Sequence, residues 1–284
     1  MAPWVRWRQA WKQRSDDAVL RKRSIPDALW QATLQRYPFI TMRTGDELLR
    51  LRRMSTLFLA NKEFSGANGM QVSDEVAVAV AMQACLPILN LGLACYGGFK
   101  GIVMHADEVV AQRVEIDDDG VVHEYAEPLS GEAMQGGPVM LSWRDVADAG
   151  ETAAWGYNVV IHEFAHVLDM SCQGSHAQLA TPELRLLHQQ WLRGLKQEFQ
   201  IFVDAVGREA HTVLDPYGAQ SLQEFFAVAS EAFFVQPLEL QHTQNGLYQL
   251  MRDCYLQDPA ACMCWQNAHK KRSLPAPFFL SCYK

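Results

Sequence analysis

Apolar residues recur every three to four positions along several stretches of the chain, which is the period of a helix with one buried face. This pattern predicts helices over residues 46–60, 158–169, 182–202 and 221–234. The stretch 73–93 is apolar on nearly all sides, so we expect it to form a buried helix. Serine residues at the first positions of the stretches 73–93 and 221–234 are suited to cap these two helices.

Shorter apolar and β-branched runs predict strands over residues 102–104, 109–116, 121–125 and 139–143. Residues 117–120, Asp-Asp-Asp-Gly, give a hairpin signal between the second and third runs. The clusters 64–69 and 215–218 are predicted turns. The fold class is therefore α+β, mostly helical, with a small mixed sheet beside the 158–169 helix. The predicted strand 139–143 lies shortly before that helix, and an exposed edge of this strand could pair with an extended peptide.

The composition is that of a globular protein: 284 residues, 49% hydrophobic and 20% charged. The net charge of −7 argues against general nucleic-acid binding, so no direct nucleic-acid partner is expected. The longest apolar run, residues 84–94, is broken by Pro87, Asn90 and Gly92, and the N-terminus lacks the apolar core of a secretory signal. We therefore expect no membrane partner.

The seven cysteines form an odd set without the spacing of a disulfide framework. Such a set is typical of reduced thiols, which predicts a cytoplasmic location. Cys262 and Cys264 are separated by one residue and not by the usual two of a metal site, so we interpret them as structural.

Candidate chemistry is concentrated in the predicted helix 158–169, which contains His162-Glu163-x-x-His166. Residues four apart share one face of a helix, so both imidazoles can reach one zinc ion. Glu163 follows the first histidine and is placed to act as a general base on water at the metal. Phe164 and Val167 lie on the opposite, apolar side of the helix.

A catalytic zinc usually takes a third protein ligand. The Gly and His of a metzincin continuation are replaced by Asp169 and Cys172, which excludes that class. Glu224 and Glu231 both qualify as a later carboxylate ligand. They lie about 10 Å apart along one helix, so only one is expected to coordinate, and spacing alone leaves the choice open. Asp169 is either a hydrogen-bond partner of a histidine ring or a surface carboxylate.

Several segments together carry a family resemblance: residues 74–85, 118–124, 137–143, 158–169 and 224–234. Their sequences and order resemble the Mlc titration factor A family over residues 38–260. The family comprises bacterial cytosolic zinc peptidases similar in catalytic core to the anthrax lethal factor protease domain. The resemblance implies a zincin-like metallopeptidase core acting on peptide substrates, of the gluzincin type with a downstream glutamate, and aminopeptidase-like.

The resemblance also implies roles for individual residues. Zn²⁺ would be bound by His162, His166 and Glu224, with Glu163 as the general base. Tyr217, seven residues before Glu224, would contribute a hydroxyl that stabilises the transition state.

A second function follows from the family name, which reflects capture of the Mlc transcriptional repressor of sugar-uptake (phosphotransferase system) genes. The resemblance therefore implies an Mlc-type repressor as a partner. Capture needs no catalysis, so the alternative function is a non-catalytic binding protein that titrates the repressor.

The predicted organisation is an N-terminal helical arm (residues 1–35), a zinc metallopeptidase domain (36–260) and a C-terminal tail (261–284). Trp4, Trp7 and Trp11 recur at helical spacing among basic residues of the arm. We interpret the arm as a packed or frayed terminal helix, with an interaction segment as the alternative.

Overall fold

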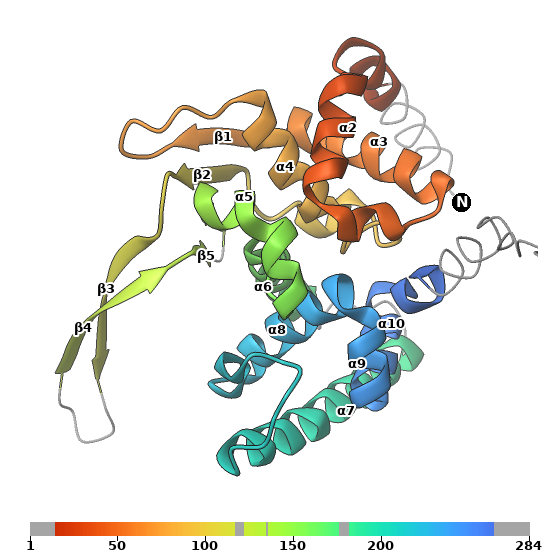
Figure 1. Cartoon of the computed structure of the whole chain (residues 1–284). Coiled ribbons are helices and arrows are strands. Elements are labelled where there is room, and N and C mark those ends of the chain that lie inside the picture. Colours follow the sequence, from red (N-terminus) through yellow and green to blue (C-terminus); the bar gives the residue numbers. More distant parts are fainter. Residues whose placement is uncertain (1–14, 117–121, 135, 176–181, 264–284) are drawn as a thin grey trace, which may run out of the picture.

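Helices dominate the computed structural model, which describes residues 15–116, 122–134, 136–175 and 182–263 (Figure 1). The α-helices are α2 (Asp27–Arg36), α3 (Gly45–Asn61), α4 (Asp74–Cys85), α5 (Trp143–Thr152), α6 (Val159–Ser175), α7 (Pro182–Gly207), α8 (Leu222–Val235), α9 (Pro237–Thr243) and α10 (Asn245–Tyr255). Short 3-10 helices are η1 (Pro38–Met42), η2 (Leu93–Tyr96), η3 (Ala153–Trp155) and η5 (Pro216–Ala219). The strands are β1 (Glu63–Gly66), β2 (Gly101–His105), β3 (Val109–Ile116), β4 (Val122–Leu129), β5 (Gly131–Ala133) and β6 (Val139–Ser142).

The main sheet has four strands in the order β1-β2-β6-β5. The strands β1, β2 and β6 are parallel, whereas β5 pairs antiparallel with β6 and forms one edge. The strands β3 and β4 pair separately as an antiparallel ribbon that stands away from the helices (Figure 1). The predicted α+β class with a small mixed sheet is confirmed.

The helix α6 lies at the centre, where it packs against β5, α4 and α8. Its apolar side is anchored by Phe164, which is fully buried. The Phe164 ring centroid lies 4.9 Å from that of Tyr96 and 5.8 Å from those of Phe58 and Phe99. This aromatic cluster fixes the rotation of α6 and turns its histidines away from the core.

The predicted serine caps are both present. The Ser73 hydroxyl accepts a hydrogen bond from the Val76 N–H, and the Ser221 hydroxyl accepts one from the Glu224 N–H at 3.1 Å. These bonds satisfy free N–H groups at the starts of α4 and α8. The N-terminus of α8, and with it Glu224, is therefore held in a defined position.

Several predicted boundaries are wrong for identifiable reasons. The helix expected over residues 73–93 ends at Cys85, because Pro87 has no N–H to bond the Gln83 carbonyl. The turn expected over 64–69 starts only at Ala67, since the preceding residues pair with β2 as strand β1. Trp143 begins α5 and does not extend β6, while α7 continues five residues beyond Phe202 to Gly207.

Some predictions fall outside the described residues: the aspartate turn at 117–120 and Trp4, Trp7 and Trp11. The described cysteines Cys85, Cys95, Cys254 and Cys262 are not in disulfide bonds. Among the described residues, none of the helices combines the length and the apolar character that a membrane span requires.

Candidate metal centre

The start of α6 is fixed by the buried side chain of Asn158. Its Oδ1 accepts a hydrogen bond from the Ile161 N–H at 2.9 Å, which caps the helix. Its Nδ2 donates to Gln83 Oε1 on α4 at 2.7 Å, and its backbone N–H donates to Glu231 on α8. Helices distant in sequence thus hold the first turn of α6, which carries the first histidine.

Three side chains on α6 and α8 converge on one point. His162 Nε2 lies 3.1 Å from Glu224 Oε2 and 3.2 Å from His166 Nε2. His166 Nε2 lies 3.4 Å from the same Glu224 oxygen. In a tetrahedral site with bonds of about 2.0–2.1 Å, neighbouring ligand atoms are about 3.3 Å apart. Two imidazoles and a carboxylate with this spacing fit a single metal ion, and a fourth position stays open.

Glu231 contacts the other side of the His162 ring. Its Oε1 accepts a hydrogen bond from Nδ1 of His162 at 2.7 Å, and its Oε2 accepts one from the Asn158 N–H. This contact places the ring proton on Nδ1 and leaves Nε2 free to bind a metal. The two carboxylates that spacing could not distinguish therefore take different positions: Glu224 faces the ligand atoms, and Glu231 orients a histidine from behind.

Glu163 follows His162 on α6, and its side chain is buried, with 5% exposed. Burial raises the pKa of its carboxyl to about 7, although the neighbouring histidines oppose the shift. The side chain lies against the backbone of β5 at Gly131, where a Cβ atom would come within 2.6 Å of Glu163 Cγ. Only glycine at this position of β5 leaves room for the carboxylate in its present place.

The metal-site charges depend on one another. Burial alone would raise the pKa of Glu224, but hydrogen bonds from His162 and His166 lower it to about 2. Burial would conversely lower the pKa of His162, and the carboxylates of Glu231 and Glu224 raise it well above its usual value. Without a metal, the site thus favours an ionised Glu224 beside a protonated His162.

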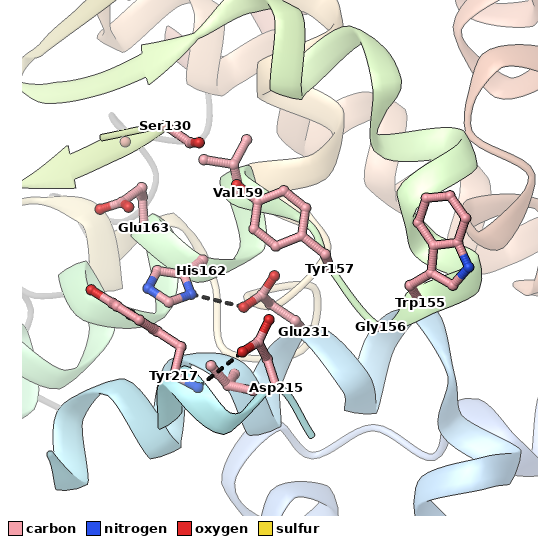
Figure 2. Close-up of a pocket in the computed structure, with 12 residues that line it drawn as sticks. Ser130, Trp155, Gly156, Tyr157, Val159, His162, Glu163, Asp215, Tyr217 and Glu231 are labelled. Atoms are coloured by element: carbon pink, nitrogen blue, oxygen red, sulfur yellow. Dashed lines mark hydrogen bonds and ion pairs between the residues drawn. The ribbon is translucent and has the colours of Figure 1, made fainter. Parts of the chain in front are cut away.

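An open cavity of about 210 Å³ lies beside this cluster (Figure 2). Its lining residues are Ser130, Gly131, Trp155, Gly156, Tyr157, Val159, His162, Glu163, Asp215, Tyr217, Val228 and Glu231. Tyr217 comes from η5 and is 39% exposed, with its ring centroid 6.2 Å from that of His162. A molecule bound in this cavity would contact His162, the carboxyl group of Glu163 and the Tyr217 ring.

One wall of the cavity is formed by the turn between η3 and α6. Gly156 has a φ of +83°, a conformation that L side chains rarely adopt, and it redirects the chain from Trp155 to Tyr157. Gln236 at the end of α8 donates to the Ala154 carbonyl. The Thr152 hydroxyl donates to the Tyr157 carbonyl at 3.1 Å. The wall is therefore built into the fold and does not depend on a ligand.

The sequence pointed to His162, Glu163, His166, Tyr217 and Glu224. The structure places His162, Glu163 and Tyr217 in the lining of this cavity, and it places His166 and Glu224 against His162 in the cluster beside it. The proposed contact of Asp169 with a histidine stays a prediction. Residues that sequence reasoning missed are Gln83, Ser130, Gly131, Trp155, Tyr157 and Asp215. Among these residues, only Asp215 could have been found from the sequence. It stands at the first position of the predicted turn 215–218, where an aspartate is typically a capping residue.

Comparison with known proteins places these features in a family. Residues 7–256 match the family model described as glucose-regulated metallo-peptidase M90. The chain is 35% identical over 260 residues to an uncharacterized protein of Synechocystis sp., covering 90% of each chain.

Two further relatives are both described as Mlc titration factor A. The protein of Serratia proteamaculans is 32% identical over 251 residues, covering 87% of this chain and 94% of the relative. The protein of Pectobacterium atrosepticum is 30% identical over 241 residues, covering 84% and 89%. The residues of the metal cluster and of the cavity all lie within the part of the chain that the family model matches.

Proposed function

The chain belongs to the M90 family of glucose-regulated metallopeptidases, and from this premise we propose that it is a zinc-dependent peptidase with a zincin-like core. The observation that carries the proposal is the convergence of His162, His166 and Glu224, whose ligand atoms lie within 4.8 Å of one another. Two imidazoles and one carboxylate form a common ligand set of catalytic zinc. When bound, zinc supplies Lewis acidity that acidifies water and polarises a carbonyl group.

Glu163 is the proposed general base. A carboxyl with a pKa of about 7 can take a proton from water near neutral pH and pass it to the leaving amine. The proposed role of Tyr217 is to donate a hydrogen bond from its hydroxyl to the oxyanion that develops on the scissile carbonyl. Its position on η5, beside His162 at the cavity wall, supports this role.

The edge strand β5 is the proposed binding surface for the substrate backbone. It pairs only with β6 among the described strands, and Gly131 at its start lines the cavity. An extended peptide could add to this edge by backbone hydrogen bonds, with the scissile bond next to Glu163. An aminopeptidase-like preference for short peptides is part of this proposal.

The test combines zinc content with peptide hydrolysis. Purified protein should hold about one zinc per chain and hydrolyse peptides, and a chelator should abolish hydrolysis until zinc is restored. Glu163→Gln should keep the zinc and lose about 10² or more in rate, the scale of a missing general base. A Glu163→Gln protein with full activity, or a His162→Ala protein with full zinc occupancy, would overturn the proposal.

Capture of an Mlc-type repressor is a second candidate, favoured by the description of two relatives as Mlc titration factor A. A stable protein contact usually covers about 800 Å² on each side, much more than one cleft. We therefore expect Glu163→Gln to bind such a repressor with near-normal affinity in a calorimetric titration. Loss of binding in this variant would instead mean that the repressor is recognised as a substrate.

A further inference from the structure

We propose that Asp215 forms a subsite for a cationic group of the peptide substrate, either its α-ammonium group or a lysine or arginine side chain. The inference rests on the proposed peptidase function and names a substrate class for it. Its starting point is the charge of the cavity: the described residues that line it include three carboxylates and no lysine or arginine. A positive group that enters the cavity would meet carboxylates and no lysine or arginine side chain among the described lining residues.

Two of the three carboxylates already have partners or a role. Glu231 is 2% exposed, and both of its oxygens accept hydrogen bonds, from His162 and from Asn158. Glu163 is 5% exposed and is the proposed base. Asp215 is exposed, and of its two oxygens only Oδ1 has a partner among the described residues, the Tyr217 N–H at 2.9 Å. The Oδ2 atom is therefore available to a ligand.

Two aromatic side chains that line the same cavity as Asp215 complete the proposed subsite. Trp155 is 78% exposed, an unusual state for so large an apolar side chain, and Tyr157 lies between it and the histidine cluster (Figure 2). Aromatic faces attract cations through their quadrupole, most strongly on tryptophan. A cavity lined by the Asp215 carboxylate, an exposed Trp155 and the Tyr157 ring is thus chemically matched to an ammonium or guanidinium group.

The subsite is held rigidly, so it can contribute to selectivity without first being ordered. Asp215 caps η5 through Tyr217, and η5 packs against α8, where the Gly218 position leaves little space next to Phe225 and Val228. Trp155 sits on the wall that Gln236 ties to α8. Preorganised groups lose less entropy when a ligand binds.

The test uses the zinc-loaded Glu163→Gln protein, which should bind peptides without cleaving them. The probes share the sequence Leu-Ala-Ala-Leu-Ala as an amide: an acetylated peptide, the same peptide with a free amino terminus, and acetylated peptides with lysine at each position in turn. Peptides with norleucine in place of each lysine provide neutral controls. The free-amine and lysine peptides distinguish the two sources of the cation, and calorimetry gives each Kd.

We expect at least one cationic peptide to bind about tenfold more tightly than its neutral control, the scale of one charge-assisted hydrogen bond. Adding Asp215→Asn should remove this preference and leave the affinity for neutral peptides unchanged, because asparagine still caps η5. The matched control is Asp148→Asn, an exposed residue of α5, which should keep the preference. A preference that survives Asp215→Asn, equal binding of all peptides, or no binding would each overturn the proposal.

Measurements of kcat and KM distinguish a role of Asp215 in substrate binding from a structural role. They also show whether the peptidase proposal itself fails. In the otherwise wild-type chain, Asp215→Asn should raise KM for the preferred cationic peptide by about tenfold and leave kcat unchanged. Asp215→Ala also removes the acceptor of the Tyr217 N–H, so it should lower kcat for every peptide. If the zinc-loaded wild type hydrolyses no peptide, the proposed function fails, while the binding measurements still decide the role of Asp215.

Discussion

At the scale of single residues, the site depends on which atom of His162 faces which carboxylate. Glu231 lies 2.7 Å from Nδ1, and Glu224 lies 3.1 Å from Nε2. A neutral imidazole carries its proton on only one nitrogen, so a buried acceptor at Nδ1 leaves the lone pair on Nε2. We therefore interpret Glu231 as a positioning residue and Glu224 as the ligand.

This division of roles predicts different losses of zinc affinity. Glu231→Gln keeps the size of the side chain but removes the charge behind His162, and should weaken zinc binding about 10- to 100-fold. Glu224→Gln removes a ligand and should weaken it much more. The measurement is a competition titration with a chromophoric chelator, together with circular dichroism to establish that each variant is folded.

Glu239→Gln is the matched control, because Glu239 is exposed on α9 and its substitution should leave zinc affinity unchanged. If Glu231→Gln weakens zinc binding more than Glu224→Gln, the assigned roles are reversed.

At the scale of secondary structure, the short strand β5 brings the sheet edge to the α6 helix. Gly131 pairs with Leu141 of β6 and at the same time touches the side chain of Glu163. This close approach of strand and helix requires the absence of a side chain. The position of the Glu163 carboxylate, the proposed base, therefore depends on the position of β5, the strand proposed to bind the substrate.

The substitution Gly131→Ala tests this coupling. The added Cβ would lie 2.6 Å from Glu163 Cγ, so the carboxylate must move. We expect hydrolysis to fall roughly tenfold or more, because a shift of about 1 Å in a catalytic group can cost on the order of 10²-fold. Zinc content should be unchanged, because the three heavy atoms nearest to the added Cβ all belong to Glu163 and none belongs to a proposed zinc ligand.

Hydrolysis rates and zinc content of Gly131→Ala are compared with those of Gly98→Ala, where a Cβ meets no atom within 4 Å. Equal activities of the two variants would show that the close contact with Glu163 has no catalytic importance.

At the scale of the whole molecule, the metal cluster joins two helices that also form much of the core. The proposed ligands come from α6 and α8, which pack directly on each other, and His162 and Glu224 are 62 residues apart in the sequence. An ion that binds only the folded arrangement stabilises it by mass action. Zinc should therefore act as a cross-link between the two helices.

The resulting stabilisation should depend on pH. The pKa of His162 is raised when folded, so without metal its protonated form stabilises the fold below about pH 6.5, and this contribution is lost as pH rises through the raised pKa. Zinc must displace that proton, so its stabilising effect should grow with pH. At a zinc excess of about 1,000 Kd we expect a Tm increase on the order of 10 °C.

Thermal unfolding with zinc or with chelator, at pH 6 and pH 8, measures this effect. The difference in Tm between the two conditions should be larger at pH 8, and His162→Ala should show none. His242→Asn, an exposed histidine of α9, should behave as the wild type. A zinc effect of equal size at both pH values would contradict the competition between proton and metal.

Features that depend on neighbouring residues could be predicted from the amino-acid sequence alone. The spacing of His162 and His166 defines one helix face, and the apolar period predicts α6, α8 and the buried α4. The capping serines mark helix starts because their hydrogen bonds span only three residues. These interactions form within a few residues, so the local pattern contains the information that sets them.

Features that depend on contacts between distant segments could not be predicted in this way and are visible only in the folded molecule. Glu224 and Glu231 lie on one helix at equivalent spacing, and their different contacts with His162 arise from the packing of α8 on α6. The three-residue strand β5 is too short to show a pattern, and it forms because β6 provides a partner. Asp215 and Trp155 are 60 residues apart in the sequence and line the same cavity, because long-range packing positions the segments that carry them. The local pattern of apolar and polar residues contains no information about such packing.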